Sequence, residues 1–253
     1  MGESHLLSSI FYNEIVDEIN KIQFTKCDAH KIKKYLVHSI LKKTEPLLRK
    51  FIILEIHLNK NTCDPDYSKN AHFLRLQLEK KYPLIVNLFF LKCRHICNNI
   101  SIFFNRLIQD YEEIKTTFHE NKNFKVTSIN IGLGDDHHNG ESVLSFCINN
   151  DLEIFYKPKN FISEMIFQKT LEILQFKELY SCIPQYLDKQ NYVWQIGISS
   201  PLQETPLLEE FYTKIGNILS VFYLFRTTDI HYENLLVKNN SPFFIDLETL
   251  LQP

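Results

Sequence analysis

Apolar residues recur every three or four positions through most of the first half of the chain, the spacing of an amphipathic helix. The clearest run is 71–118, AHFLRLQLEKKYPLIVNLFFLKCRHICNNISIFFNRLIQDYEEIKTTF, in which Pro83 either breaks a helix or begins one. The basic cluster KIKKYLVHSILKK at 31–43 is typical of the solvent-facing side of such a helix. Residues 59–70, NKNTCDPDYSKN, are expected to be a loop between helices. The pattern therefore predicts a helical region over residues 1–125.

Near residue 126 the period changes from helical to alternating, which indicates strands. Asn149-Asn150-Asp151 lies between two of these segments and has the composition of a tight hairpin turn. The expected strands are KVTSINIGLG (125–134), SVLSFCINN (142–150), LEIFYKP (152–158), NYVWQIGIS (191–199), NLLVK (234–238) and PFFID (242–246), with helices at 161–176 and 207–226. This order of helices, a small sheet, a helix and a final hairpin predicts an α+β fold without internal repeats.

Composition narrows the class of protein only slightly. With 253 residues, 44% hydrophobic, 23% charged and a net charge of −2, the chain resembles an ordinary soluble globular protein. A nucleic-acid partner is not expected, because the net charge provides no broad electrostatic attraction to nucleic acid or to an acidic membrane. The first 15 residues lack the basic start of a secretion signal, and the apolar stretch at 82–90 is too short to span a bilayer. We therefore expect a cytoplasmic protein without a transmembrane segment.

Six cysteines are scattered along the chain, and none forms a CxxC pair. Cys93, His95 and Cys97 could suggest a metal site. On a helix, however, the two cysteines share one face while the histidine points elsewhere. Buried free thiols are the favoured interpretation.

Glycine is scarce, with six in the chain, and three of them fall in GLGDDHHNG at Gly132, Gly134 and Gly140. Such a concentration marks a place where the backbone turns tightly or approaches another group closely. One interpretation is a simple loop between strands. The other is a loop over a ligand, such as a phosphate.

Lys157 in FYKPKN (155–160) stands near the end of an apolar strand, and Pro158 ends regular pairing. Most lysines in such positions are solvated edge residues. A lysine on the strand after a glycine-containing loop, followed by a helix, is nevertheless how kinases hold the α- and β-phosphates of ATP. In that case Glu164, on the predicted helix, could pair with Lys157.

The end of the chain, TDIHYENLLVKNNSPFFIDLETLLQP, gathers polar residues around two short apolar runs. Asp229 and Asn234 are separated by four residues, as are the catalytic Asp and metal-binding Asn of protein kinases, and Asp246 follows at the end of the last strand. Taken singly, each has a structural explanation as a turn residue or a strand end. Taken in order with Lys157 and the glycine loop, they predict a phosphoryl-transfer site with a few oxygen ligands for Mg²⁺.

Four segments together resemble the dehydratase domain of class II lanthipeptide synthetases (the LanM type). They are GDDHHNGESV, EIFYKPKNF, YLFRTTDIHYENLLV and FFIDLETLL. The resemblance covers 126–253 well. It extends more faintly upstream, to KKYPLIVNLFF and NRLIQDYEEIKTTF.

This resemblance implies a fold similar to lipid kinases, with a helical N-terminal region at 1–125 and a kinase-like core at 126–253. It implies an enzyme that uses ATP and Mg²⁺ to phosphorylate Ser and Thr of a ribosomally made precursor peptide rich in Ser, Thr and Cys. The phosphate is then eliminated to leave dehydroalanine or dehydrobutyrine. By motif match, Lys157 with Gly134 and Gly140 would bind nucleotide, Asp229 and His231 would act in transfer, Asn234 and Asp246 would hold magnesium, and Asp135 and His137 would serve elimination.

Three departures from the family pattern stand out. Lys159 replaces the usual Arg after the proline, and YVWQIGIS lacks the acidic residue that tends to follow Trp194. The family continues with more of its catalytic lobe and then a zinc-dependent cyclase, so the chain is expected to be a truncated product, a split subunit or a fragment. A second chain could then supply the missing lobe and cyclase, and elimination is not expected from this chain alone. A small-molecule kinase of the aminoglycoside or choline type, or an inactive peptide-binding remnant, are the alternatives.

Overall fold

A computed structural model describes residues 10–60, 67–119, 123–137, 140–198, 208–247 and 249–250. The chain forms two compact units, and each is described by itself. The first comprises residues 1–115 and 120–151, and the second comprises 116–119 and 152–253. Helices and antiparallel strands occur together, so the predicted α+β class is confirmed.

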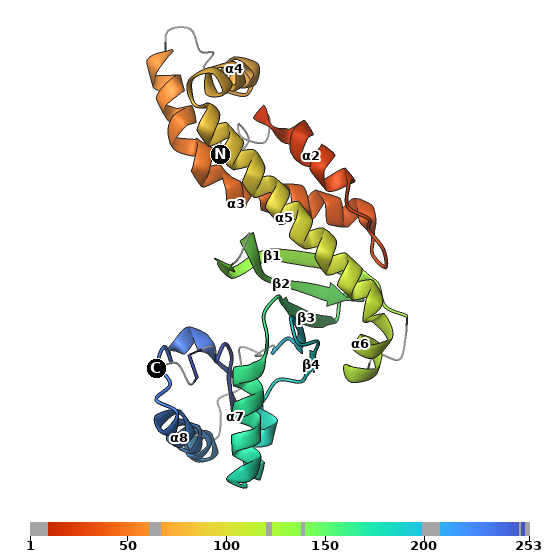
Figure 1. The fold of residues 1–253 in the computed structure, drawn as a ribbon, viewed down its shortest axis with the longest axis vertical. Coiled ribbons are helices and arrows are strands. Elements are labelled where there is room, and N and C mark those ends of the chain that lie inside the picture. Colours follow the sequence, from red (N-terminus) through yellow and green to blue (C-terminus); the bar gives the residue numbers. More distant parts are fainter. Residues whose placement is uncertain are drawn as a thin grey trace. The chain divides into compact units, whose positions relative to one another are not determined.

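The first unit is built on long helices (Figure 1). They pack through aromatic and aliphatic side chains. The helix at 83–109 has three fully buried phenylalanines, at Phe89, Phe103 and Phe104. The Phe11 ring centroid lies 5.1 Å from that of Phe89. The proline at 83 begins a helix rather than breaking one, since it occupies the first turn, where no backbone donor is needed. The helices are α2 (Tyr12–Asn20), α3 (Ala29–Leu58), η1 (Tyr67–Asn70), α4 (Ala71–Lys81), α5 (Pro83–Gln109) and α6 (Tyr111–Thr117), the last of which reaches the boundary between the units.

The predicted amphipathic helix at 31–43 forms part of α3. Its apolar face is buried at Ile32, Leu36 and Ile40, while Lys34 and Lys42 are exposed. The loop predicted at 59–70 begins where α3 ends, although residues 61–66 lie outside the described part of the chain.

Two antiparallel strands, β1 (Val126–His137) and β2 (Glu141–Ile148), complete the first unit. They pair with Ile129 opposite Phe146, and the Phe103 ring of α5 lies 5.2 Å from that of Phe146. After β2 the predicted turn is present. Asn149 and Asn150 both have positive φ angles (54° and 65°), and the N–H of Asp151 donates to the Ile148 carbonyl at 3.0 Å.

Glu55 of α3 is a fully buried carboxylate at the junction of α3, α4 and α5. It accepts hydrogen bonds from Lys81 Nζ at 2.7 Å, from the Tyr82 hydroxyl at 2.8 Å and from Asn59 Nδ2 at 3.2 Å. Burial by itself would raise the pKa of Glu55, but these hydrogen bonds and the Lys81 charge bring it below its ordinary value. The three helices therefore meet around one buried carboxylate whose oxygens both accept hydrogen bonds.

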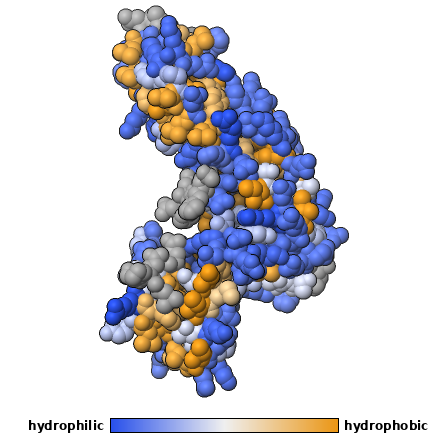
Figure 2. Space-filling model, in the orientation of Figure 1, coloured by the Kyte–Doolittle hydropathy of each residue, from blue (hydrophilic) through white to orange (hydrophobic). Residues whose placement is uncertain are grey.

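The surface of this unit carries apolar side chains where α3 and α4 lie close together. Figure 2 shows orange surface near that end, and Leu54, Leu58 and Leu76 are among the exposed large side chains.

Within the described residues, no helix is long and apolar enough to cross a membrane. The same residues contain no group of three or more His, Cys, Asp or Glu that could hold a metal ion, so Cys93, His95 and Cys97 do not form one.

The second unit has β5 (Val193–Ile196) between two antiparallel partners, β3 (Leu152–Lys157) and β4 (Tyr186–Asp188). Trp194 is fully buried, with its ring 5.0 Å from Tyr156 on the neighbouring strand. The predicted strand at 191–199 is shorter in the structure, and β4 was not predicted. Its three residues are too few to show a periodic pattern.

The chain ends in a hairpin of β6 (Leu235–Lys238) and β7 (Ser241–Phe244), as predicted. Asn239 and Asn240 form its two-residue turn, and both have the positive φ angles (49° and 57°) that such a turn requires. The remaining elements are α7 (Ile162–Ile173), η3 (Lys177–Cys182), α8 (Leu208–Leu224) and η4 (Tyr232–Asn234).

A hydrophobic core joins this hairpin to the two long helices of the second unit. Phe167 and Leu171 of α7, Val221 and Phe222 of α8, and Phe244 of β7 belong to one buried cluster. The rings of Phe222 and Phe244 meet edge to face at 5.0 Å. This packing sets the position of the residues that precede and follow the hairpin.

The compact units divide after residue 151, whereas the boundary predicted from the sequence lies after residue 125. A compact unit is defined by packing and a functional domain by activity, so the predicted domain division stays a prediction.

We predict that Glu55→Gln lowers the free energy of unfolding by about 1–3 kcal/mol at pH 7, because a charge-assisted hydrogen-bond acceptor is lost from a buried site. The pH dependence should also change. A carboxyl whose pKa is lowered in the folded state contributes stability above its unfolded pKa of about 4.3, and that stability is lost as pH falls through the folded pKa. Urea denaturation between pH 7 and pH 3 should therefore give a flatter profile for the variant below about pH 5.

Glu45→Gln, on the same helix, is the matched control and should follow the wild type. Parallel pH profiles for Glu55→Gln and the wild-type chain would show that the carboxylate does not carry this stability.

Candidate functional site

Lys157 ends β3 and is only 7% exposed, so it is not a solvated edge lysine. Its residue pairs with Val193 of β5, and Pro158 follows, where the ladder stops. The Lys157 ammonium lies 5.8 Å from the centroid of the Phe161 ring. A lysine buried in this way is costly unless opposite charges lie near it.

Glu164, in the first turn of α7, provides one such charge. It is 8% exposed, and its Oε1 atom is buried without a hydrogen-bond partner among the described residues. Burial raises the pKa of Glu164 above its ordinary value, against the attraction of Lys157. Burial likewise lowers the pKa of Lys157, while Glu164 and Asp246 oppose that change. Burial thus favours the neutral form of each group, and their mutual attraction favours the charged forms.

Asp246 lies two residues beyond β7 and forms an ion pair with Lys159, the cation that follows Pro158. Its backbone has a positive φ of 63°, an unusual conformation for a residue other than glycine. Asp246 also acts electrostatically on both Lys157 and Glu164. We call these four residues the charge quartet: Lys157, Lys159, Glu164 and Asp246. Its formal charges sum to zero.

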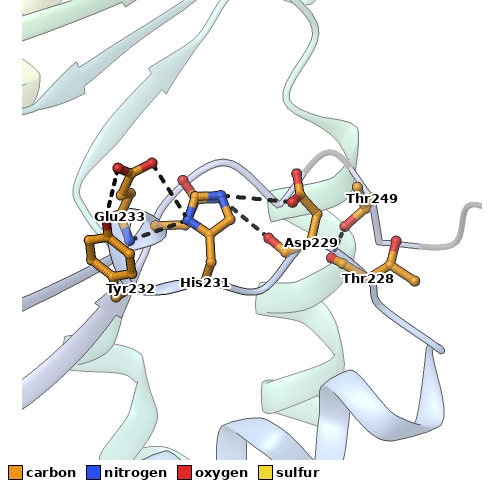
Figure 3. A network of polar contacts seen from close by, with 7 residues as sticks. Thr228, Asp229, His231, Tyr232, Glu233 and Thr249 are labelled. Carbon is orange, nitrogen blue, oxygen red and sulfur yellow. Dashed lines mark hydrogen bonds and ion pairs between the residues drawn. The ribbon is translucent and has the colours of Figure 1, made fainter.

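The predicted catalytic loop lies before the hairpin and is held by its own polar contacts (Figure 3). Asp229 has a positive φ of 59°, and its side chain is 64% exposed. His231 Nε2 lies 3.8 Å from Asp229 Oδ1, and His231 Nδ1 accepts the N–H of Glu233 at 3.3 Å. A carboxylate is therefore presented to solvent, with an imidazole beside it.

Asn234 connects this loop to the residues after the hairpin. Its Nδ2 donates to the Asp229 carbonyl at 3.4 Å and lies 3.3 Å from His231 Nε2. Its backbone carbonyl accepts the N–H of Ile245 at 2.9 Å, and the Thr249 hydroxyl donates to the Thr228 carbonyl. Ile245, the residue before Asp246, is thus hydrogen-bonded to Asn234. The structure therefore brings four predicted site residues into one region of the second unit: Asp229, His231, Asn234 and Asp246.

The glycine loop belongs to the first unit. Gly134 and Gly140 both have positive φ angles (73° and 77°), and a Cβ built at Gly134 would meet nothing within 4 Å. Asp135 and His137 lie on β1, but their side chains are outside the described part of the structure. The predicted approach of this loop to Lys157 therefore stays a prediction.

Lys43 is a polar residue that the sequence analysis assigned to the solvent-facing side of its helix. Lys43 is in fact half-buried, and its Nζ lies 3.4 Å from Ser142 Oγ of β2. A Cβ at Gly132 would come within 2.7 Å of the same ammonium, which a flexible lysine can move to relieve, so glycine is favoured there mainly by its φ of 72°. Helical spacing could have separated Lys43 from the exposed Lys42, because Lys43 follows the buried Leu36 by seven residues and the buried Ile40 by three.

Lys214 of α8 was also missed. It is 7% exposed, donates to Ser241 Oγ at 2.8 Å and pairs with Glu210 at 2.7 Å. Since Ser241 begins β7, this buried lysine anchors the hairpin that leads to Asp246.

The fold and site together define an α+β protein with a buried lysine and a buried glutamate that act on each other electrostatically, and a loop carrying Asp, His and Asn. Residues 82–253 match a family described as a domain of unknown function (DUF4135), and the chain belongs to that family. The chain is also 24% identical over 188 residues to the lacticin 481/lactococcin biosynthesis protein LcnDR2 of Lactococcus lactis subsp. lactis. That alignment covers 69% of this chain and 20% of the relative, so the chain spans about a fifth of that relative's length.

These matches confirm the resemblance to class II lanthipeptide synthetases that the motifs predicted. The family match begins at residue 82 and includes all nine predicted site residues, from Gly134 to Asp246.

We predict that Glu164→Gln lowers the pKa of Lys157 further, because the substitution removes the nearby negative charge that favours the protonated lysine while leaving burial unchanged. NMR titration of the lysine ¹³Cε resonances would measure this, with Lys157→Met assigning the signal. Glu172→Gln, on an exposed position of the same helix, is the control. An unchanged or raised Lys157 pKa would mean that Glu164 does not compensate this lysine.

Proposed function

We propose that this chain transfers the γ-phosphoryl group of ATP to serine and threonine hydroxyls of a precursor peptide, as the first half of their dehydration. The observation that carries the proposal is that Lys157 and Glu164 are both buried and act on each other electrostatically, with Asp246, the ion-pair partner of Lys159, acting on both. A strand lysine paired with a glutamate of the following helix, and an acid after a later strand, are the parts that kinases use on ATP and its metal. The proposed kinase-like fold rests on the same arrangement.

The peptide substrate is proposed from the comparison. The relative is named for lacticin 481 and lactococcin biosynthesis, and the motifs of this chain follow the order found in lanthipeptide dehydratases. A small-molecule kinase could use similar acidic residues, but no contact among the described residues favours it over the peptide enzyme.

The residues present fit Mg²⁺ and ATP by the chemistry of their donor atoms. Asp246 offers carboxylate oxygens, and Asn234 makes its side-chain hydrogen bonds through Nδ2, which leaves its amide oxygen for a cation. Magnesium prefers such a small set of oxygen ligands together with substrate phosphates. The metal would supply neutralisation of phosphate charge when bound. Lys157 would contribute a fixed cation to the phosphates.

Asp229 is the residue proposed to act on the peptide hydroxyl. Its carboxylate is exposed and lies beside His231, so it can accept a hydrogen bond from an incoming hydroxyl. In transfer, the Ser or Thr oxygen forms a bond to the γ-phosphorus, the bond from that phosphorus to the β–γ bridging oxygen breaks, and ADP leaves. The hydroxyl proton passes to Asp229, and phosphoserine or phosphothreonine is the product.

Dehydration is completed by elimination of this phosphate, for which Asp135 and His137 are the proposed participants. Removal of the α-proton requires a base, and departure of phosphate requires cationic or acidic assistance. Histidine suits proton transfer near neutral pH. This half of the proposal rests on the motif and on the comparison.

We predict different defects for Asp229→Asn and Asp246→Asn. Asp229→Asn should bind ATP nearly as well as the wild type while the rate of transfer falls by roughly 100-fold or more, because its role is to take up a proton. Asp246→Asn should also weaken Mg·ATP binding by about tenfold or more, because a metal ligand is lost. Displacement of a fluorescent ATP analogue measures binding, and mass spectrometry of a Ser/Thr-rich precursor peptide measures transfer.

Asp188→Asn, in β4, is the matched control and should behave as the wild type. Equal losses of nucleotide affinity in the two site variants would contradict the separate roles. No displacement of the analogue by ATP from the wild-type chain would overturn the proposed function itself.

A further inference from the structure

The ion pair between Lys159 and Asp246 places a cation on the carboxylate that the proposed function assigns to magnesium. The Lys159 side chain is 24% exposed and that of Asp246 is 45% exposed, so the pair is only partly screened by water. The same carboxylate therefore has an internal cation as its partner before any metal arrives.

Electrostatic coupling extends from this pair to the rest of the charge quartet. Lys159 lowers the pKa of Lys157, and it also lowers that of Glu164. Displacing Lys159 from Asp246 would thus leave two ammonium groups close together, with a dication now on the carboxylate that had balanced one of them. A divalent cation binding by itself therefore works against the charge balance of the quartet.

A nucleotide phosphate changes this balance. Its negative charges stabilise the charged forms of both lysines, and they also favour binding of a metal to Asp246. The four residues are neutral as a set, so a metal and a polyphosphate together disturb the balance less than either ligand does separately.

We propose that Lys159 is the resident counter-ion of Asp246 and that it makes binding of the divalent cation and of the nucleotide cooperative. In the absence of ligands it occupies Asp246. In the presence of phosphate it is released to the phosphate while the metal takes the carboxylate. This inference rests on the proposed function for its nucleotide, whereas its first step, competition between Lys159 and a cation at Asp246, does not.

An alternative role for the same ion pair is to fasten the segment after β3 to the segment after β7. In that case removal of the lysine charge would loosen Asp246 and weaken metal binding. The two roles therefore predict opposite signs for the affinity of a cation measured without nucleotide.

The test uses the full chain and Mn²⁺, a paramagnetic substitute for Mg²⁺ whose free concentration is read by electron paramagnetic resonance. Mn²⁺ is titrated into the wild type, Lys159→Met and Lys159→Arg, with and without a non-hydrolysable ATP analogue. Lys169→Met, at an exposed position of α7, is the matched control for loss of one lysine charge.

Without nucleotide, Lys159→Met should bind Mn²⁺ about fivefold more tightly than the wild type, the effect of releasing a partly exposed ion pair. Lys159→Arg and Lys169→Met should stay near the wild-type value. In the wild type the analogue should raise Mn²⁺ affinity by about fivefold or more, and this coupling factor should be smaller in Lys159→Met, where only the direct attraction between metal and phosphate remains, and persist in Lys159→Arg. Adding Asp246→Asn to Lys159→Met should abolish the gain, which would place the cation at Asp246.

Equal or weaker Mn²⁺ binding by Lys159→Met without nucleotide would overturn the competition, as would the absence of Mn²⁺ binding from every variant. A coupling factor unchanged in Lys159→Met would overturn the cooperativity. Circular dichroism checks the fold of each variant, and Lys159→Gln replaces Lys159→Met if the latter does not fold. If ATP fails to displace a fluorescent analogue from the wild type, the proposed function fails, and the nucleotide-free comparison still decides whether Lys159 competes for Asp246.

Discussion

A lysine ammonium buried at the end of β3 is the constraint on which the second unit depends. Lys157 is nearly inaccessible to water, and a charge in that position is tolerated only when opposite charges lie close to it. Glu164 comes from α7 and Asp246 from the segment after β7, so the site exists only if β3, α7 and the final hairpin meet. The apolar cluster that joins α7, α8 and β7 provides the free energy for that meeting, because it buries several aromatic rings together.

The final hairpin fixes the positions of Asn234 and Asp246, whose side chains carry the oxygen atoms of the proposed site. Its two-residue turn at Asn239 and Asn240 specifies the register of β6 against β7, and all four residues of β7 are buried. Lys214 bonds to the first residue of β7, and Ile245 bonds to the carbonyl of Asn234. Asn234 and Asp246 are therefore held from both ends of the hairpin, which suits residues proposed to share a cation.

Polar groups that are buried or half-buried also organise the first unit. Glu55 gathers hydrogen bonds from three side chains where α3, α4 and α5 meet, and Lys43 lies against Gly132 and Ser142 of the β1–β2 pair. A polar group that gives up water requires specific partners in specific directions. Such groups therefore restrict the possible packing arrangements of the helices and strands more than apolar contacts do.

Periodicity and motif spacing determined much of this protein by themselves: the α+β class, the order of the main helices and strands, the asparagine turn at 149–151, the final hairpin and the family resemblance. These features are local, since 3.6- and two-residue repeats and turn chemistry act over a few positions. The sequence also singled out Lys157, Asp229, Asn234 and Asp246, because their spacing follows a known order. It did not reveal that Lys157 is buried, that Asp246 pairs with Lys159, that Lys43 leaves the solvent-facing side of its helix, or that Lys214 anchors the hairpin. These outcomes were decided by tertiary structure, because the environment of a lysine depends on residues that are distant in sequence, and the lysine itself carries no mark of which neighbours will surround it.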